Sequence, residues 1–241
     1  MPRIDTYIWR ARIVPAVLAA IPLLTFVVFI ADSPIAGLLT PVVGLGAILL
    51  GAAEWIRGRG LKTEQRLKRI WDGMPTTAAL RHRGERDFAW APRRLAIEGL
   101  SGQRLPTARE EEARPDDSEA RYERAVHAAI AKLRSAAPSD TVLASENASY
   151  GVRRNTRGIK TQALVVLALA TVGHVLLAAT AADGWAIGLF VLAIDLAAWL
   201  FWTLVVRDVW VREQADKFTD QLFTDLAVFE LPPSNGTRQI T

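Results

Sequence analysis

Residues 163–206 read ALVVLALATVGHVLLAATAADGWAIGLFVLAIDLAAWLFWTLVV. This stretch is almost entirely apolar and is interrupted only by the short connector Asp183-Gly184. The connector separates two runs, Ala163 to Ala182 and Trp185 to Val206. Each run is about the length that a helix needs to cross the hydrocarbon core of a membrane. This stretch therefore predicts a hairpin of two transmembrane helices.

A second pair of apolar runs lies near the N-terminus. Ile13 to Ala31 and Ile35 to Ala53 are joined by Asp32-Ser33-Pro34. All 29 Lys and Arg residues of the chain lie outside the four runs and outside both connectors. Because positive charge stays on the cytoplasmic side, both hairpins are expected to face outward and both termini to lie in the cytoplasm. The expected class is all-α, with four transmembrane helices in the cell (inner) membrane.

The composition agrees with a membrane protein that carries a polar appendage. The chain is 51% hydrophobic and 22% charged, and the two populations are segregated along it. Residues 54–161 hold 22 basic and 15 acidic residues with the signs interleaved. A cytoplasmic segment facing anionic lipid favours such a bias, so direct binding of nucleic acid is not expected. The absence of cysteine excludes disulfides, thiolate catalysis and thiolate metal sites.

The pattern divides the chain into four segments. These are an N-terminal arm with the first hairpin at 1–57, a cytoplasmic insert at 58–161, the second hairpin at 162–206, and a C-terminal helix and tail at 207–241. In the insert, Gly58 and Gly60 are expected to interrupt the second span before a short helix at 61–71. Residues 72–115 hold Pro75, Pro92 and Pro106 and several glycines, and predict mostly irregular chain. A helix is expected from 116 to Pro138, followed by a short one at 140–148.

An apolar seam runs through the C-terminal segment. Its members recur at spacings of three and four: Val211, Ala215, Phe218, Leu222, Leu226 and Phe229. The spacing predicts a helix that continues the fourth span without a break as far as Pro232. The seam needs a partner, which is either the insert helix around Tyr122 to Leu133 or the same tail of a second copy. The intramolecular partner is the favoured alternative.

Two ionisable residues, His174 and Asp195, lie inside the second hairpin. Counted from the connector, each lies some 14 to 17 Å into the membrane at a rise of about 1.5 Å per residue. Adjacent antiparallel helices would bring them within hydrogen-bonding distance. Three roles are open: a structural bond that fastens the hairpin, the polar lining of an oligomeric pore, and a proton relay.

The usual catalytic patterns do not occur. The sequence holds no GxGxxG, GxxxxGK[ST] or HExxH motif, and His82, His127 and His174 are far apart. The acidic run Glu110-Glu111-Glu112 is interpreted as a solvated region before a helix. We therefore predict no catalytic residues, no metal site and no cofactor, and a protein that is not an enzyme.

Two compact strings in the insert carry a resemblance to a known group. The first is Trp71-Asp72-Gly73-Met74-Pro75-Thr76-Thr77 with Leu80-Arg81-His82-Arg83, and the second is Glu146-Asn147 with Tyr150-Gly151-Val152-Arg153-Arg154-Asn155, Gly158 and Lys160. Pro106-Thr107 and Glu110-Glu111 lie between them. Residues 65–160 thus resemble uncharacterised bacterial multi-pass membrane proteins that are similar to membrane effectors of antiphage defence systems. The chain departs from that pattern at Val152, where an aromatic residue is expected.

The resemblance implies control by a nucleotide-type signal. Independently, six side chains of the two strings are donors suited to an anionic group: Arg81, His82, Arg83, Arg153, Arg154 and Asn155. For Arg153 and Arg154 the alternative is an anchor to lipid headgroups, because they lie about ten residues before the third span.

The function expected from these features is an oligomeric inner-membrane effector or channel-like protein. Its cytoplasmic domain would sense a partner or an anionic ligand. The alternative is a non-enzymatic membrane scaffold or assembly factor that recruits a cytosolic protein.

Overall fold

The computed structural model describes residues 13–29, 42–84, 87–136, 141–180 and 185–229. All regular elements in these ranges are helices, so the predicted all-α class is confirmed. Both predicted outward connectors and the first and last twelve residues lie outside the described ranges. The contacts divide the chain into two compact units, and each is described by itself. The first unit comprises residues 1–67 and 148–214, and the second comprises 68–147 and 215–241.

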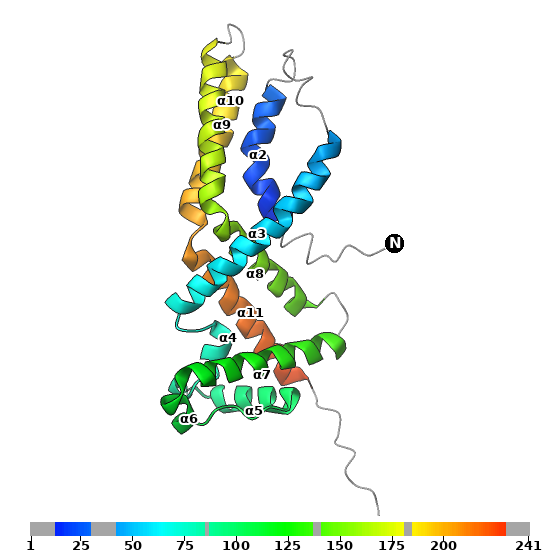
Figure 1. Ribbon diagram of the computed structural model, residues 1–241, viewed down its shortest axis with the longest axis vertical. Helices are drawn as coiled ribbons and strands as arrows, with labels where there is room; N and C mark the ends of the chain where they lie inside the picture. Colours follow the sequence, from blue (N-terminus) through cyan, green and yellow to red (C-terminus); the bar gives the residue numbers. More distant parts are fainter. Residues whose placement is uncertain (1–12, 30–41, 85–86, 137–140, 181–184, 230–241) are drawn as a thin grey trace, which may run out of the picture. The chain divides into compact units, whose positions relative to one another are not determined.

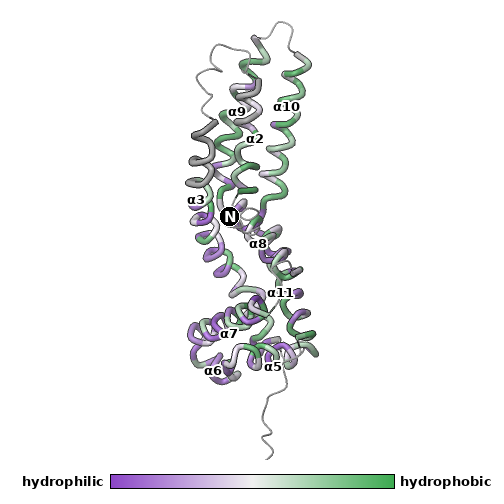
Figure 2. Tube along the Cα trace, turned by 90° about the vertical axis from the view of Figure 1, so that its right-hand side faces the viewer, coloured by the Kyte–Doolittle hydropathy of each residue, from purple (hydrophilic) through white to green (hydrophobic). Residues whose placement is uncertain are grey.

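The first unit contains the apolar helices α2 (Val14–Phe29), α9 (Lys160–Thr180) and α10 (Trp185–Leu200). α9 and α10 lie side by side as a hairpin, and Figure 2 shows both as hydrophobic along most of their length. Two stretches in the described ranges, Lys160–Thr180 and Ala186–Val205, are long and apolar enough to cross a membrane, and only 22% of each is buried. The second predicted hairpin therefore has membrane-spanning dimensions, whereas the structure does not confirm four spans.

α3 (Val42–Ile70) corrects the prediction of a break at Gly58 and Gly60, because it is one helix of 29 residues. Gly60, together with Gly158 of a second helix, permits a close helix crossing instead. A Cβ at Gly60 would collide with the side chain of Asn155, and a Cβ at Gly158 would lie 2.8 Å from the carbonyl carbon of Arg59. α3 and α8 (Val142–Gly158) thus approach each other at backbone distance. α8 is also longer than the short helix predicted at 140–148.

The fourth apolar helix does not continue unbroken into the tail, as the seam had suggested. α10 ends at Leu200 and is followed by a π-helical turn, η4 (Phe201–Val205), in which the Val206 N–H donates to the Phe201 carbonyl over 3.1 Å. Val206 leaves the helical conformation at ψ 79°, and α11 (Asp208–Val228) begins as a new helix. Trp202 and Val206 are buried in the apolar core of the first unit. Burial of these two side chains accounts for the interruption.

The second unit contains helices where irregular chain was predicted for residues 72–115. They are α4 (Pro75–Ala78), η3 (His82–Gly84), α5 (Trp90–Ser101) and α6 (Ala108–Ala113), and all precede the long α7 (Pro115–Ala136) (Figure 1). The prolines and glycines mark helix ends. Pro75 begins α4, Gly102 closes α5 with a left-handed φ of 68°, and Thr107 forms a capping box with Glu110 at the start of α6.

One apolar core holds the second unit together. The α7 residues Tyr122, Val126, Ala129 and Leu133 are buried in it, as their spacing predicted. Leu222, Phe223 and Leu226 of α11 belong to the same core, and Phe218 and Phe229 pack against it. The tail seam is therefore packed within the chain, and the favoured intramolecular partner is confirmed for this part of the seam.

The packing units differ from the four predicted segments. Residues 58–67, 148–161 and 207–214 group with the apolar helices rather than with the insert or the tail. The unit boundaries fall inside or at the ends of α3, α8 and α11 rather than in loops. Continuous helices therefore connect the apolar unit to the polar one.

Candidate functional site

His174 and Asp195 of the second predicted hairpin lie within hydrogen-bonding distance, as their matched distance from the connector predicted. Nδ1 of His174 on α9 lies 2.8 Å from Oδ2 of Asp195 on α10. The two side chains are 1% and 2% exposed. One helical turn away, Trp199 donates from Nε1 to Oγ1 of Thr171 over 3.3 Å. The hairpin is thus fastened by two polar contacts on one helix–helix seam.

Close packing brings these groups together. Gly188 of α10 faces Ala178 of α9 so closely that a Cβ would lie 2.9 Å from the Ala178 methyl group. Among the described residues no donor reaches Oδ1 of Asp195. A buried carboxylate that has one satisfied oxygen depends strongly on its single partner.

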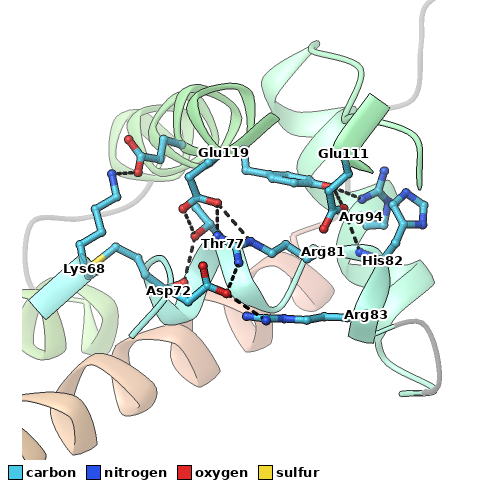
Figure 3. A network of polar contacts seen from close by, with 12 residues as sticks. Lys68, Asp72, Thr77, Arg81, His82, Arg83, Arg94, Glu111 and Glu119 are labelled. Carbon is cyan, nitrogen blue, oxygen red and sulfur yellow. Dashed lines mark hydrogen bonds and ion pairs between the residues drawn. The ribbon is translucent and has the colours of Figure 1, made fainter. Parts of the chain in front are cut away.

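A second polar cluster lies in the second unit and contains the Arg81-His82-Arg83 string (Figure 3). Arg81 donates to Glu119 over 2.8 Å and to Asp72 over 3.0 Å. Arg83 pairs with the same Asp72 over 2.9 Å. The charges of Arg81 and Arg83 hold the pKa of Asp72 below its usual value. These two arginines are therefore already engaged by carboxylates of the chain.

His82 is used for folding as well. Its backbone N–H donates to Glu111 over 3.1 Å, its ring Nε2 lies 3.2 Å from the Pro106 carbonyl, and the ring packs on Trp90. His82 therefore brings the first string of the resemblance into contact with Pro106 and Glu111. Their contacts hold the helices of this unit in place.

Arg94 is the central residue of this cluster, and the sequence reasoning missed it. Its guanidinium donates to the Leu80 carbonyl and the Pro106 carbonyl, each over 2.6 Å, and to the Tyr122 hydroxyl over 3.1 Å. Burial raises the pKa of Tyr122 to about 12, and its hydroxyl donates to Glu111 over 2.9 Å. Nothing local in the sequence distinguishes Arg94 from Arg93, because its hydrogen-bond partners lie on three separate segments.

A pocket of about 610 Å³ opens beside this cluster. Its charged lining consists of Lys68, Arg69, Arg81, Asp72, Glu111, Glu112, Asp116 and Glu119, with His82 and Tyr122. The carboxylates outnumber the Lys and Arg residues five to three, so the lining favours a cationic group over an anionic one. In the described part of the chain, no group of three or more His, Asp or Glu side chains is arranged to hold a metal ion.

Tyr150 to Lys160 of the second string belong to the first unit, whereas Glu146-Asn147 and the whole first string belong to the second. Arg153 donates to the Trp210 carbonyl over 2.8 Å and lies over the Trp210 ring. Arg154 pairs with Glu64 and donates to Asn155 over 3.2 Å. Asn155 is buried at the crossing of α3 and α8. All three predicted contacts thus bind groups of the chain itself.

Asp208, the first residue of α11, forms a clamp that the sequence did not reveal. It accepts two hydrogen bonds from Arg66, over 2.6 and 3.0 Å, and a third from Arg157 over 2.8 Å. Burial raises the pKa of Asp208, but the Arg66 hydrogen bonds and the Arg157 charge outweigh it and leave the pKa lowered. The clamp ties the start of α11 to α3 and α8 just after the π-helical turn.

Comparisons of the chain with models of protein families, with curated protein sequences and with solved structures find no match. The likeness to antiphage membrane effectors therefore rests on the two strings alone. Within this chain, the six candidate contact residues of those strings have structural partners. Functional inference must come from the geometry.

Proposed function

We propose that the protein is a non-enzymatic membrane scaffold. It would hold its second unit at the cytoplasmic face of the inner membrane and recruit a cytosolic protein there. The observation that supports this most is the hairpin of α9 and α10. Its outer surface is apolar, and its buried polar residues, His174 and Asp195, bind each other within one chain.

The outer surface of the hairpin suits lipid. Its exposed side chains are large and apolar: Val165, Leu169, Val172 and Leu176 on α9, and Ile187, Leu189, Phe190 and Leu196 on α10. A core helix of a soluble protein would bury such residues. Four spans with both termini inside complete the proposal, since every Lys and Arg lies on one side of the apolar runs.

The second unit suits a protein partner better than an anionic ligand. The arginines of its first string are neutralised, and its pocket lining is net acidic. Phe88, which precedes α5, is fully exposed, and Leu95 of α5 is 69% exposed. An acidic pocket and exposed apolar side chains in the same unit are features of a protein that docks a basic protein segment.

An oligomeric effector or channel-like protein is the second candidate. The π-helical turn at Phe201–Val205 favours it, because such interruptions of α-helices are frequent at functional sites. The role in antiphage defence that the resemblance implies belongs to this candidate. The two functions differ in the expected role of Asp195.

In the scaffold, Asp195→Asn is expected to be nearly neutral, because an amide oxygen still accepts from His174. Asp195→Leu leaves the imidazole without its partner and is expected to destabilise the protein by about 1–2 kcal/mol. Thermal unfolding and ion flux in reconstituted vesicles measure both effects. Ion flux through the wild-type protein that changes in both variants while stability stays constant would favour the channel and refute the scaffold.

The topology is tested separately. Reporter fusions at Ser33 and Gly184 are expected to report the outside, and fusions after Gly102 and Thr241 the cytoplasm, because the basic residues set the orientation. A cytoplasmic signal at Gly184 would contradict the membrane placement.

A further inference from the structure

The net positive charge of the structured chain is concentrated in one part of the first unit. Its residues 54–67, 148–160 and 206–214 hold ten Lys and Arg residues against four Asp and Glu residues. The second unit holds 16 Lys and Arg residues against 17 Asp and Glu residues. The excess of cations therefore belongs to the ends of the helices that adjoin the membrane-length stretches.

Arginines already engage all four carboxylates of this region. Glu54 pairs with Arg57, Glu64 with Arg154, and Glu213 with Arg153. Asp208 is shared by Arg66 and Arg157. Among the residues that the structure describes, Lys160 and Arg207 form no ion pair.

The π-helical turn gathers these two cations. Its geometry leaves backbone carbonyls without helical partners, and Lys160 donates to the carbonyls of Thr203 over 3.3 Å and Val206 over 2.9 Å. Arg207 donates to the same Thr203 carbonyl over 3.5 Å. Arg157 lies close enough for its charge, like that of Arg207, to act on Lys160. Two cations thus lie on one exposed turn, and among the described residues Asp208 is the carboxylate whose charge acts on Lys160.

We propose that Lys160 and Arg207 bind a phosphate group at this turn. Neutral carbonyl oxygens orient the ammonium and guanidinium groups but do not neutralise their charge. A phosphate group supplies both the negative charge and several acceptor oxygens for converging donors. Arg207 and Thr203 are exposed, and Lys160 is partly so, which leaves the cluster open to a ligand.

The position of the cluster suggests two sources of the phosphate group. Lys160 begins one membrane-length stretch and Val205 ends the other, so both stretches meet the headgroup level at this turn. This step rests on the proposed membrane placement. A phospholipid headgroup and a soluble phosphorylated molecule share the recognised chemistry, and the experiment separates them.

The test uses the full chain and the double variant Lys160→Gln, Arg207→Gln. The matched control is Lys132→Gln, Lys217→Gln, which removes the same charge from exposed positions of the second unit. In the lipid arm, protein is extracted from vesicles of phosphatidylcholine containing some phosphatidylglycerol, and bound phosphatidylglycerol is counted by native mass spectrometry. In the soluble arm, inorganic phosphate is titrated by calorimetry into protein held in nanodiscs of phosphatidylcholine alone.

The double variant is expected to lose about 30-fold in affinity for the probe that binds, and the control to lose none. Retained phosphatidylglycerol with no phosphate binding identifies a lipid headgroup, and phosphate binding without anionic lipid identifies a soluble ligand. Either result supports the site if it depends on the two cations. Binding of neither probe, or equal binding by the double variant and the control, overturns it.

Two further variants keep the test independent of folding. Lys160→Arg retains the charge and is expected to retain binding. If the double variant does not fold, Arg207→Gln alone is expected to weaken binding about fivefold, since Arg207 is exposed and makes one long hydrogen bond. Loss of the site with the expected reporter topology would refute this inference and leave the membrane placement intact.

Discussion

Leu222→Asp is expected to unfold the second unit. Leu222 is fully buried in the core that α11 shares with α7, and the described residues of that core are all apolar, so a carboxylate there would lack a cationic partner among them. Burial of an unpaired charge costs several kcal/mol, about as much as a small domain has in total. Limited proteolysis of residues 68–147 and the loss of near-ultraviolet circular dichroism would report the change.

Thr224→Asp is the matched control for this substitution. It introduces the same charge on the same helix at an exposed position, two residues further along. We expect a change of no more than about 0.5 kcal/mol, from repulsion by Asp220 and Asp225. Equal protease resistance of the Leu222→Asp variant and the wild type would show that the seam is not part of a core.

Gly158→Ala is expected to destabilise the first unit by about 2–3 kcal/mol. The added methyl group would lie 2.8 Å from the Arg59 carbonyl carbon and 2.9 Å from the Gly60 nitrogen. Both atoms are backbone, so the clash cannot be relieved by rotation of a side chain. α3 and α8 would have to separate, and a drop in the melting temperature would measure the cost.

Gly58→Ala is the matched control, because it makes the same glycine-to-alanine change at a position where no second helix approaches. It lies on α3, and no atom comes within 4 Å of a Cβ built there. The variant is expected to gain up to about 1 kcal/mol, because alanine is the better helix former. The explanation of the crossing would be wrong if both variants shifted the melting temperature in the same direction.

Periodic features were predictable from the sequence. The apolar runs of 163–206 determined a helical hairpin, and the α7 spacing from Tyr122 to Leu133 determined which face is buried. His174 and Asp195 could be placed opposite each other because helical rise converts sequence distance from the connector into depth. In each case the physical cause acts along one helix or between two neighbours in the chain.

The structural predictions that failed concern residues whose conformation depends on contacts with segments far away in the sequence. Gly58 and Gly60 suggested a break, but α3 continues through both, and α8 crosses it at Gly60. The seam suggested one continuous helix from α10 into the tail, but Trp202 and Val206 are buried and the chain turns at Val206. The prediction that Arg81, Arg153 and Arg154 contact an anion or lipid headgroups stays a prediction, and the structure adds that carboxylates and carbonyls of other segments bind them.

The sequence by itself determined the helical class, the membrane-length hairpin and the segregation of charge, because hydropathy and helical period are local properties. Only the tertiary structure decided which cations are neutralised and which, such as Lys160 and Arg207, are not. The reason is that a charged side chain on one segment is satisfied by groups far away in sequence. Its availability for a ligand is a property of the packed chain.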